Sequence, residues 1–251
     1  MPQGRVPATG AIVHTAGALG TGQDASVQYV NLVGTDGWLQ AQDDATMQRI
    51  ALPKYTKVLV SPPHLGRVKF RVQEGAHLGR TLSLSEANAR MYLGSKSSVQ
   101  QPARMMVTYG RYVERWISEA RGGQPIDQQM ATVAINGLTV AVTMNSVWNG
   151  LFTPLEPGEY KVLLPDVPHR GNMTRFYRDT EPRLQFDQVW FPIQHGDNSR
   201  YVHVGNVSDG CVTVLDLARW ADVHEALISH RSPDGRSVAT LTVRGTPERP
   251  R

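Results

Sequence analysis

A cysteine and a histidine lie close together in this chain and could form a nucleophile with its base. Cys211 is the single cysteine of the 251 residues, so it cannot form a disulfide within the chain. His203 precedes it by eight residues. A thiolate attacks carbonyl carbons well, and an imidazole beside it can take the thiol proton. The alternative is that Cys211 is a small buried apolar residue, as many free cysteines are.

The residues between His203 and Cys211 would position both side chains. Residues 205–210 begin and end with glycine, and they predict a turn after which the chain returns on a neighbouring strand. Gly210 permits a backbone conformation that other residues resist. The backbone N–H groups from Ser208 through Asp209 to Cys211 are candidates for an oxyanion hole. Ser208 could either orient the imidazole or bond to the loop.

Other side chains are weaker candidates for the same site. His195, in a His-Gly pair, is a rival base and lies 16 residues before Cys211. Trp190 and His169 could line a cleft, although aromatic residues in strands more often fill cores. Arg200 could bind substrate carboxylates, with a solvated surface arginine as the ordinary interpretation.

The pattern of apolar residues predicts a mainly β fold with a few short helices. Asn136-Gly137 between two β-like runs indicates a hairpin with a type I′ turn. In the last of the expected helices, His224 falls on the apolar face and is expected to be a core residue. We expect the helices at residues 86–93, 111–121 and 216–230.

The chain divides into four parts by composition. A flexible lead-in covers residues 1–25, and a polar tail covers residues 246–251. Between them we expect a β-rich N-terminal module of unknown role at 26–125 and a catalytic domain at 128–245. The boundary is placed at the Gly and Pro residues of 122–125, which break the chain.

Charge and hydropathy exclude some classes of partner. The net charge of +4 is mildly basic, but the chain has no run of five or six basic residues, so we expect no nucleic-acid partner. No stretch approaches the roughly 20 apolar residues that cross a bilayer, so we expect no transmembrane segment. The start of the chain lacks the apolar core of a signal peptide. Paired Cys-x-x-Cys or His-Glu-x-x-His spacings do not occur, so we expect no metal and no cofactor.

Two segments together resemble the catalytic domain of the L,D-transpeptidases. His203 followed by Ser208-Asp209-Gly210-Cys211 is similar to that family's histidine strand and its S-x-G-C motif. Upstream, Thr153-Pro154, Gly158 and Tyr160 resemble its T-P-x-x-x-G-x-Y turn and strand. The resemblance covers about residues 130–230, under half of the chain. The two motifs in this order are fairly specific, whereas either alone is weak.

The resemblance implies a fold, a substrate and residue roles. It implies a β-sandwich catalytic domain in which Cys211 is acylated, His203 is the base, and Ser208 and Gly210 shape the oxyanion loop. The implied substrate is the peptide stem of bacterial peptidoglycan. The enzyme would release the terminal D-alanine and pass the acyl group to an amine, as an L,D-transpeptidase, or to water, as an L,D-carboxypeptidase.

Three departures from the family pattern narrow this expectation. Asp209 stands where many members have histidine, and Thr213 stands where an arginine is usual. The short spacing from His203 to Cys211 is similar to that of a branch delivered by type VI secretion as antibacterial effectors. That branch implies action in the periplasm or cell envelope, and a secretion apparatus or an immunity protein as partners. A different class also fits, namely a catalytically decayed peptidoglycan-binding or adaptor protein.

Overall fold

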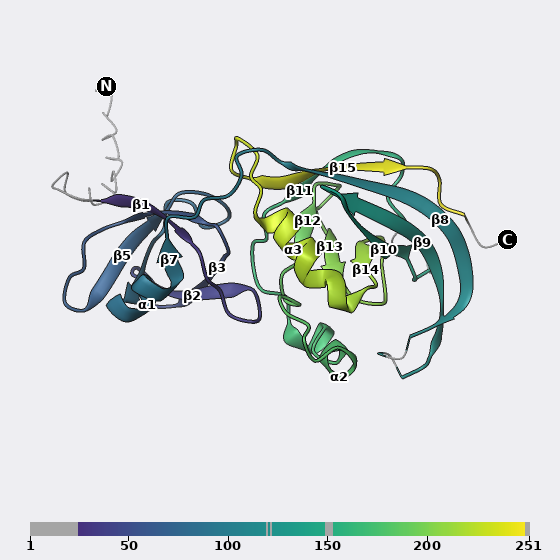
Figure 1. Ribbon diagram of the computed structural model, residues 1–251, viewed down its shortest axis with the longest axis horizontal. Coiled ribbons are helices and arrows are strands. Elements are labelled where there is room, and N and C mark those ends of the chain that lie inside the picture. The colour runs from purple at the N-terminus through teal and green to yellow at the C-terminus, as the bar shows by residue number, and fades with distance from the viewer. Residues whose placement is uncertain (1–24, 119, 121, 149–152, 249–251) are drawn as a thin grey trace, which may run out of the picture.

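The protein consists of two β-sheets joined side by side (Figure 1). The computed structural model describes residues 25–118, 120, 122–148 and 153–248, so nearly all of the predicted lead-in and the last residues of the predicted tail lie outside it. Strands make up 44% and helices 12% of the chain, which confirms the mainly β prediction. The N-terminal sheet has seven strands, and the C-terminal sheet has eight and closes into a barrel.

Alternation of apolar and polar residues builds the N-terminal sheet. In β5 (Arg67–Val72), Val68, Phe70 and Val72 are buried and the residues between them are exposed. Helix α1 (Glu86–Tyr92) begins as predicted, with the Ser85 hydroxyl accepting the Asn88 N–H at 3.3 Å. The sheet order is β3-β2-β6-β5-β4-β1-β7. The other strands are β1 (Ser26–Val30), β2 (Trp38–Asp43), β3 (Arg49–Pro53), β4 (Lys57–Val60), β6 (Thr81–Ser85) and β7 (Leu93–Gly94).

The barrel begins with two long strands, β8 and β9, which curve along one side of it (Figure 1). Asn136 and Gly137 connect β9 to β10 with positive φ angles of 47° and 91°, as the predicted type I′ turn requires. The barrel order is β10-β14-β13-β12-β11-β15-β8-β9. Its strands are β8 (Ala103–Ile117), β9 (Pro125–Ile135), β10 (Leu138–Asn145), β11 (Gly158–Leu163), β12 (Phe191–Ile193), β13 (Arg200–Val204), β14 (Val212–Val214) and β15 (Ser237–Arg244).

The helix expected at 111–121 is wrong, because residues up to Ile117 continue strand β8. The pairing of β8 with β9 shifts register between Tyr109 and Tyr112 and again between Val113 and Trp116. Each irregularity inserts residues into one strand, and this breaks the alternation of period two. The apolar residues then fall at spacings of three and four, which imitate a helix.

The change from one sheet to the other does not fall at residues 122–125, where the boundary was expected. The change of sheet occurs between Gly94 and Ala103, and residues 122–125 lie at the turn from β8 to β9 inside the barrel. The sandwich implied by the resemblance also differs from the structure. The last strand along the chain, β15, pairs in parallel with the first strand of the barrel, β8, and the strands form one closed layer.

Two α-helices, each preceded by a 3-10 turn, accompany the barrel. Helix α3 (Trp220–Ile228) confirms the helix expected at 216–230, and it buries Trp220, Val223, His224, Leu227 and Ile228. A 3-10 turn (Leu217–Arg219) precedes it. Helix α2 (Tyr177–Thr180) follows a second 3-10 turn (Gly171–Met173). No helix in the described part of the chain has the length and apolar character needed to cross a membrane.

Candidate functional site

Cys211 and His203 come together on two neighbouring strands of the barrel. His203 lies in β13 opposite Thr213 of β14, and Cys211 directly precedes β14. The two strands are parallel, so the expected simple turn and return is wrong. Residues 205–211 instead cross back to the start of the neighbouring strand. Both side chains nevertheless line one pocket.

This pocket has a volume of about 320 Å³. Its walls come from β13, from the residues beside β12 and β14, and from the segment around α2. Its lining residues are Met173, Thr174, Tyr177, Trp190, Ser199, Tyr201, His203, Val204, Val207, Asp209 and Cys211. Trp190, a weak candidate from the sequence, is therefore part of the pocket.

The imidazole of His203 is held in one tautomer. Its Nδ1 lies 2.9 Å from the Val204 carbonyl oxygen, which can only accept, so Nδ1 carries the proton. Nε2 is then an acceptor and lies 3.0 Å from the Thr213 hydroxyl. Burial lowers the pKa of His203 to about 4, so the imidazole is neutral at pH 7. This is the protonation state of a general base.

Thr213 has two acceptors for one hydroxyl proton. Its Oγ1 lies 3.0 Å from His203 Nε2 and 3.3 Å from the Val207 carbonyl oxygen. Rotation of the hydroxyl toward Val207 would free Nε2 for another donor. Thr213 therefore contacts the candidate base directly.

The indole of Trp190 stacks against two imidazoles. Its centroid lies 4.0 Å from that of His203 and 4.1 Å from that of His169, with interplanar angles of 14° and 13°. Two rings cannot share one face of an indole at these distances, so the indole lies between them. Tyr201 meets the His169 ring edge-on at 4.8 Å. His169, another weak candidate, therefore lies behind Trp190 and is not among the residues that line the pocket.

The Cys211 thiol is nearly enclosed, with 7% of the residue exposed. Burial raises its pKa to about 11, against the lowering effects of the Tyr201 and Asp209 backbone amides and the Arg200 charge. Within the described residues, no hydrogen bond links its sulfur to His203, whose ring nitrogens bond elsewhere. The resting pocket therefore contains a neutral thiol and a neutral imidazole.

Two amides of the expected oxyanion loop bond to residues at the end of β10. The Ser208 N–H donates to Ser146 Oγ at 2.9 Å, and the Gly210 N–H donates to Asn145 Oδ1 at 3.1 Å. The Ser208 hydroxyl donates to the Cys211 carbonyl at 2.8 Å, so Ser208 bonds the loop and does not orient the imidazole. Gly210 has a φ of 76°, the left-handed conformation for which glycine was expected.

Asp209 presents a carboxyl group to the pocket beside the thiol. Burial raises its pKa, and its Oδ1 has no hydrogen-bond partner among the described residues. Its negative charge also raises the pKa of Cys211. Asp209 therefore does not activate the thiol in the resting site.

A buried polar network beneath the loop was missed by sequence reasoning. Gln128 of β9 donates to the Asn206 carbonyl at 2.8 Å, and its own carbonyl oxygen accepts from Thr143 and Ser146. Asn206 also bonds to Ser118. Two signals were present in the sequence, namely the adjacent glutamines at the start of β9 and the Asn-Ser pair at the end of β10. The network fixes the loop that carries Cys211.

His195 lies apart from the thiol. Its Nδ1 is 3.1 Å from Arg200 Nη1, and its ring tilts against Tyr160 at 5.8 Å. It is not among the residues that line the Cys211 pocket. The structure thus places His203, and not His195, in the pocket of Cys211.

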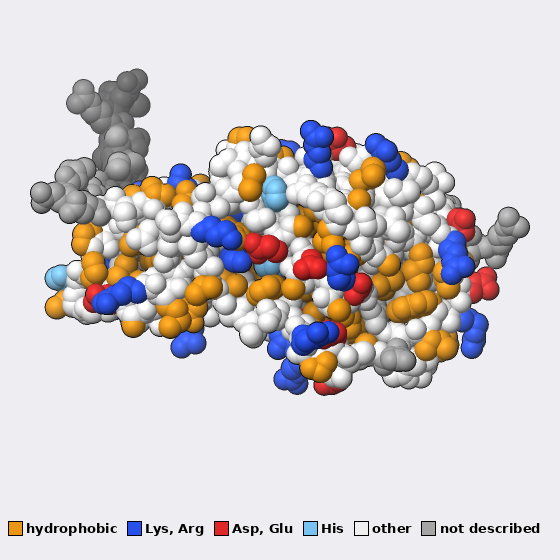
Figure 2. Space-filling model, in the orientation of Figure 1, with side chains coloured by type: hydrophobic (Ala, Val, Ile, Leu, Met, Phe, Trp, Pro, Cys, Tyr) orange, Lys and Arg blue, Asp and Glu red, His pale blue; other side chains and the backbone are white. Residues whose placement is uncertain are grey.

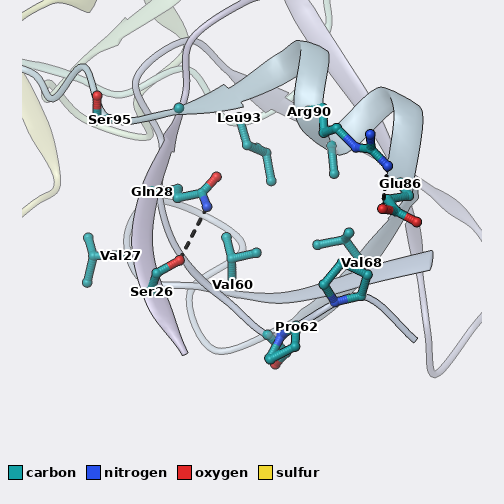
Figure 3. Close-up of a pocket in the computed structure, with 14 residues that line it drawn as sticks. Ser26, Val27, Gln28, Val60, Pro62, Val68, Glu86, Arg90, Leu93 and Ser95 are labelled. Atoms are coloured by element: carbon teal, nitrogen blue, oxygen red, sulfur yellow. Dashed lines mark hydrogen bonds and ion pairs between the residues drawn. The ribbon is translucent and has the colours of Figure 1, made fainter. Parts of the chain in front are cut away.

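A second hollow lies in the N-terminal module, between β1, β4 and α1 (Figure 3). Val60, Val68 and Leu93 form its apolar part, and its charged pair, Arg90 and Glu86, is an ion pair. Its lining contains neither cysteine nor histidine. Across the described ranges, no group of three acidic, histidine or cysteine side chains is placed to hold a metal ion.

Comparison with known proteins gave no match to a family model, a curated protein or a solved structure. The chemistry of the site is therefore argued from its residues. The Cys211 sulfur can carry an acyl group. The neutral His203 can accept a proton at Nε2 once the Thr213 hydroxyl turns away.

Proposed function

We propose that the protein is a cysteine acyltransferase that acts on the stem peptides of bacterial peptidoglycan. Cys211 is the nucleophile and His203 is its base. The observation that carries the proposal is that both side chains line one pocket, with the tautomer of His203 fixed so that Nε2 accepts. The S-x-G-C and T-P-x-x-x-G-x-Y motifs support the choice of substrate.

The reaction proceeds through a thioester. The Thr213 hydroxyl turns to Val207, and His203 Nε2 takes the thiol proton as sulfur attacks the stem carbonyl. The C–N bond to the terminal D-alanine breaks, and the imidazolium returns the proton to the leaving amine. An amine or a water molecule then attacks the thioester and gives its own proton to His203. The C–S bond breaks, and the imidazolium returns that proton to the Cys211 thiolate.

The raised pKa of Cys211 makes this proton transfer depend on substrate. A resting thiol with a pKa of about 11 and an imidazole with a pKa of about 4 do not form an ion pair at pH 7. Proton transfer is therefore expected together with attack on the carbonyl, and not before it. The bonded amides of the loop must also be released, or other donors must stabilise the oxyanion.

The place of action belongs to the same proposal. The short-motif resemblance supports action in the periplasm or cell envelope of a target bacterium. Delivery by a specialised secretion system, with an immunity protein as a partner, accords with that resemblance.

A second candidate is a peptidoglycan-binding or adaptor protein that has lost activity. The enclosed, protonated thiol and its lack of a bond to His203 favour this alternative. In that case the pocket would bind stem peptides without acylation.

The test is mass analysis of tetrapeptide muropeptides after incubation with the full chain, with and without an added amine. The proposal expects loss of D-alanine, amine exchange or cross-links with the wild type. Cys211→Ala should show none of these products, and His195→Gln should match the wild type. Binding without any product, equal in wild type and Cys211→Ala, would establish the second candidate instead.

A further inference from the structure

The turn Phe186–Val189 precedes the pocket wall and has a strained backbone. Phe186 has a φ of 60°, a left-handed conformation that bulky residues rarely adopt and that costs on the order of 1–3 kcal/mol. Its carbonyl accepts the Val189 N–H at 3.1 Å and the Trp220 Nε1–H at 3.0 Å. Such a conformation persists only where the surroundings determine it.

The N-terminal module supplies much of that determination. The Phe186 N–H donates to the Thr35 carbonyl of the module at 2.7 Å. Trp38, with 2% of its surface exposed, donates its indole N–H to the Gln188 carbonyl at 3.4 Å. The same carbonyl accepts the His169 N–H at 3.0 Å. One oxygen therefore links the module to a member of the ring stack.

Gly37 allows the closest approach between the module and this turn. Its φ is 92°, and a Cβ built on it would lie 2.2 Å from Cγ2 of Val189. No side chain fits there unless the Val189 side chain or the turn that carries it moves. Val189 is adjacent to Trp190, so a shift at this contact is transmitted directly to the pocket wall.

One buried ion pair and one partly exposed pair hold the module against α3 and the residues that follow it. Arg231 is fully buried, pairs with Glu74 of the module at 2.9 Å and donates to the Lys54 carbonyl at 3.1 Å. Tyr55 and Lys54 bond to Glu225 at 2.6 and 3.0 Å. Figure 2 shows basic and acidic side chains next to one another between the two sheets. These contacts therefore hold the module in a defined position against the barrel.

We propose that the N-terminal module is a positioning element for the Cys211 pocket. Its loop Thr35–Trp38 holds the turn Phe186–Val189 and thereby presses Trp190 against His203. Trp38 and Gly37 are positioning residues, because they act through the turn and touch neither thiol nor imidazole. The inference concerns the pocket's geometry and holds whatever substrate the pocket takes.

The test compares two glycines with similar backbone conformations. Gly37→Ala introduces both a left-handed alanine and a clash with Val189. Gly66→Ala, at a φ of 74° with no atom within 4 Å, introduces the first without the second. The readout is the pKa of the His203 imidazole, followed by NMR on histidine-labelled protein and assigned with His203→Gln.

In Gly37→Ala, Trp190 moves away from His203 and water reaches the ring. Its pKa should rise by about one unit or more from its lowered value, toward an ordinary histidine near 6.5. Gly66→Ala should leave the pKa unchanged. The double variant Gly37→Ala/Val189→Ala removes the clashing methyl group and should bring the pKa of His203 part of the way back to its wild-type value.

An unchanged His203 pKa in folded Gly37→Ala would overturn the proposal. If that variant does not fold, Trp38→Phe, which keeps a ring and loses the N–H donor, is measured in the same way and decides the question. None of these readouts uses muropeptides. A protein without peptidoglycan activity could therefore still show the shift, so the two proposals fail separately.

Discussion

Two histidines of the barrel are buried in opposite chemical settings. His203 lies in the pocket, with Val204 and Thr213 bonded to its two nitrogens. His224 lies on the buried face of α3 and stacks on Phe186, with ring centroids 4.4 Å apart. Neither of its ring nitrogens has a hydrogen-bond partner among the described residues. Burial lowers both pKa values, to about 4 and about 3. A lowered pKa therefore does not distinguish a base from a core residue, whereas a fixed tautomer beside a thiol does.

The largest expected difference between them is in activity. His203→Gln should lower D-alanine release from muropeptides by roughly 10²–10⁴-fold, because it removes the proton acceptor. His224→Phe, which keeps a ring in the aromatic core, should stay within a few-fold of wild type. Equal losses in both variants would show that His203 acts only as a packed ring.

The thiol beside His203 should be unusually hard to ionise. With a pKa of about 11, the rate of Cys211 alkylation by iodoacetamide should keep rising above pH 9. At pH 7 it should be about 100-fold slower than for the denatured chain, since an ordinary thiol ionises near 8.5–9. A rate that levels off near pH 7 in the folded protein would instead reveal a preformed ion pair with His203.

His224 should make the fold sensitive to acid. The unfolded chain binds a proton near pH 6.5, whereas the folded chain keeps this ring neutral down to about pH 3. The stabilising contribution is therefore complete above pH 6.5 and is lost as the pH falls toward 3. Urea unfolding at pH 7 and pH 4.5 should show a smaller loss of stability in His224→Phe than in wild type. An identical loss in both would assign the acid sensitivity to other groups.

The smallest expected effect is at Thr213, whose hydroxyl occupies the acceptor atom Nε2 of His203. Thr213→Val keeps the branched shape and removes one hydrogen bond, which contributes about 0.5–1.5 kcal/mol. Because Nε2 is then open to the thiol, alkylation of Cys211 at pH 7 should become roughly 2–10-fold faster. Thr213→Ser retains the hydroxyl and should react like wild type. A slower reaction in Thr213→Val would mean that the hydroxyl assists the base.

Local patterns in the sequence were sufficient for several features. The apolar stripe placed His224 in the core of a helix, the Asn136-Gly137 pair gave a hairpin, and Gly210 indicated the bend before Cys211. Each depends on residues that are close together in the chain. The shared pocket of His203 and Cys211 depends on a parallel strand pairing that their spacing did not predict.

Features that depend on distant pairing were not predictable. The bulges of β8 are set by its partner β9, so the sequence of β8 alone imitates a helix. The contact of Trp38 with Gln188 joins residues 150 positions apart. No local pattern specifies which carbonyl a buried indole will find, and the role of the module therefore emerged only from the structure.

Because β13 pairs in parallel with β14, the positions of His203 and Cys211 depend little on the length of the segment that connects the two strands. Neighbouring strands lie about 4.8 Å apart, and Cys211 stands two residues before Thr213, the partner of His203, so strand pairing positions the base and the nucleophile. The connecting segment 205–211 only has to return to the start of the next strand. Insertions or deletions there can alter what enters the pocket while leaving its two reactive groups side by side. The number of residues between the histidine and the cysteine is thus a poor measure of how their side chains are placed.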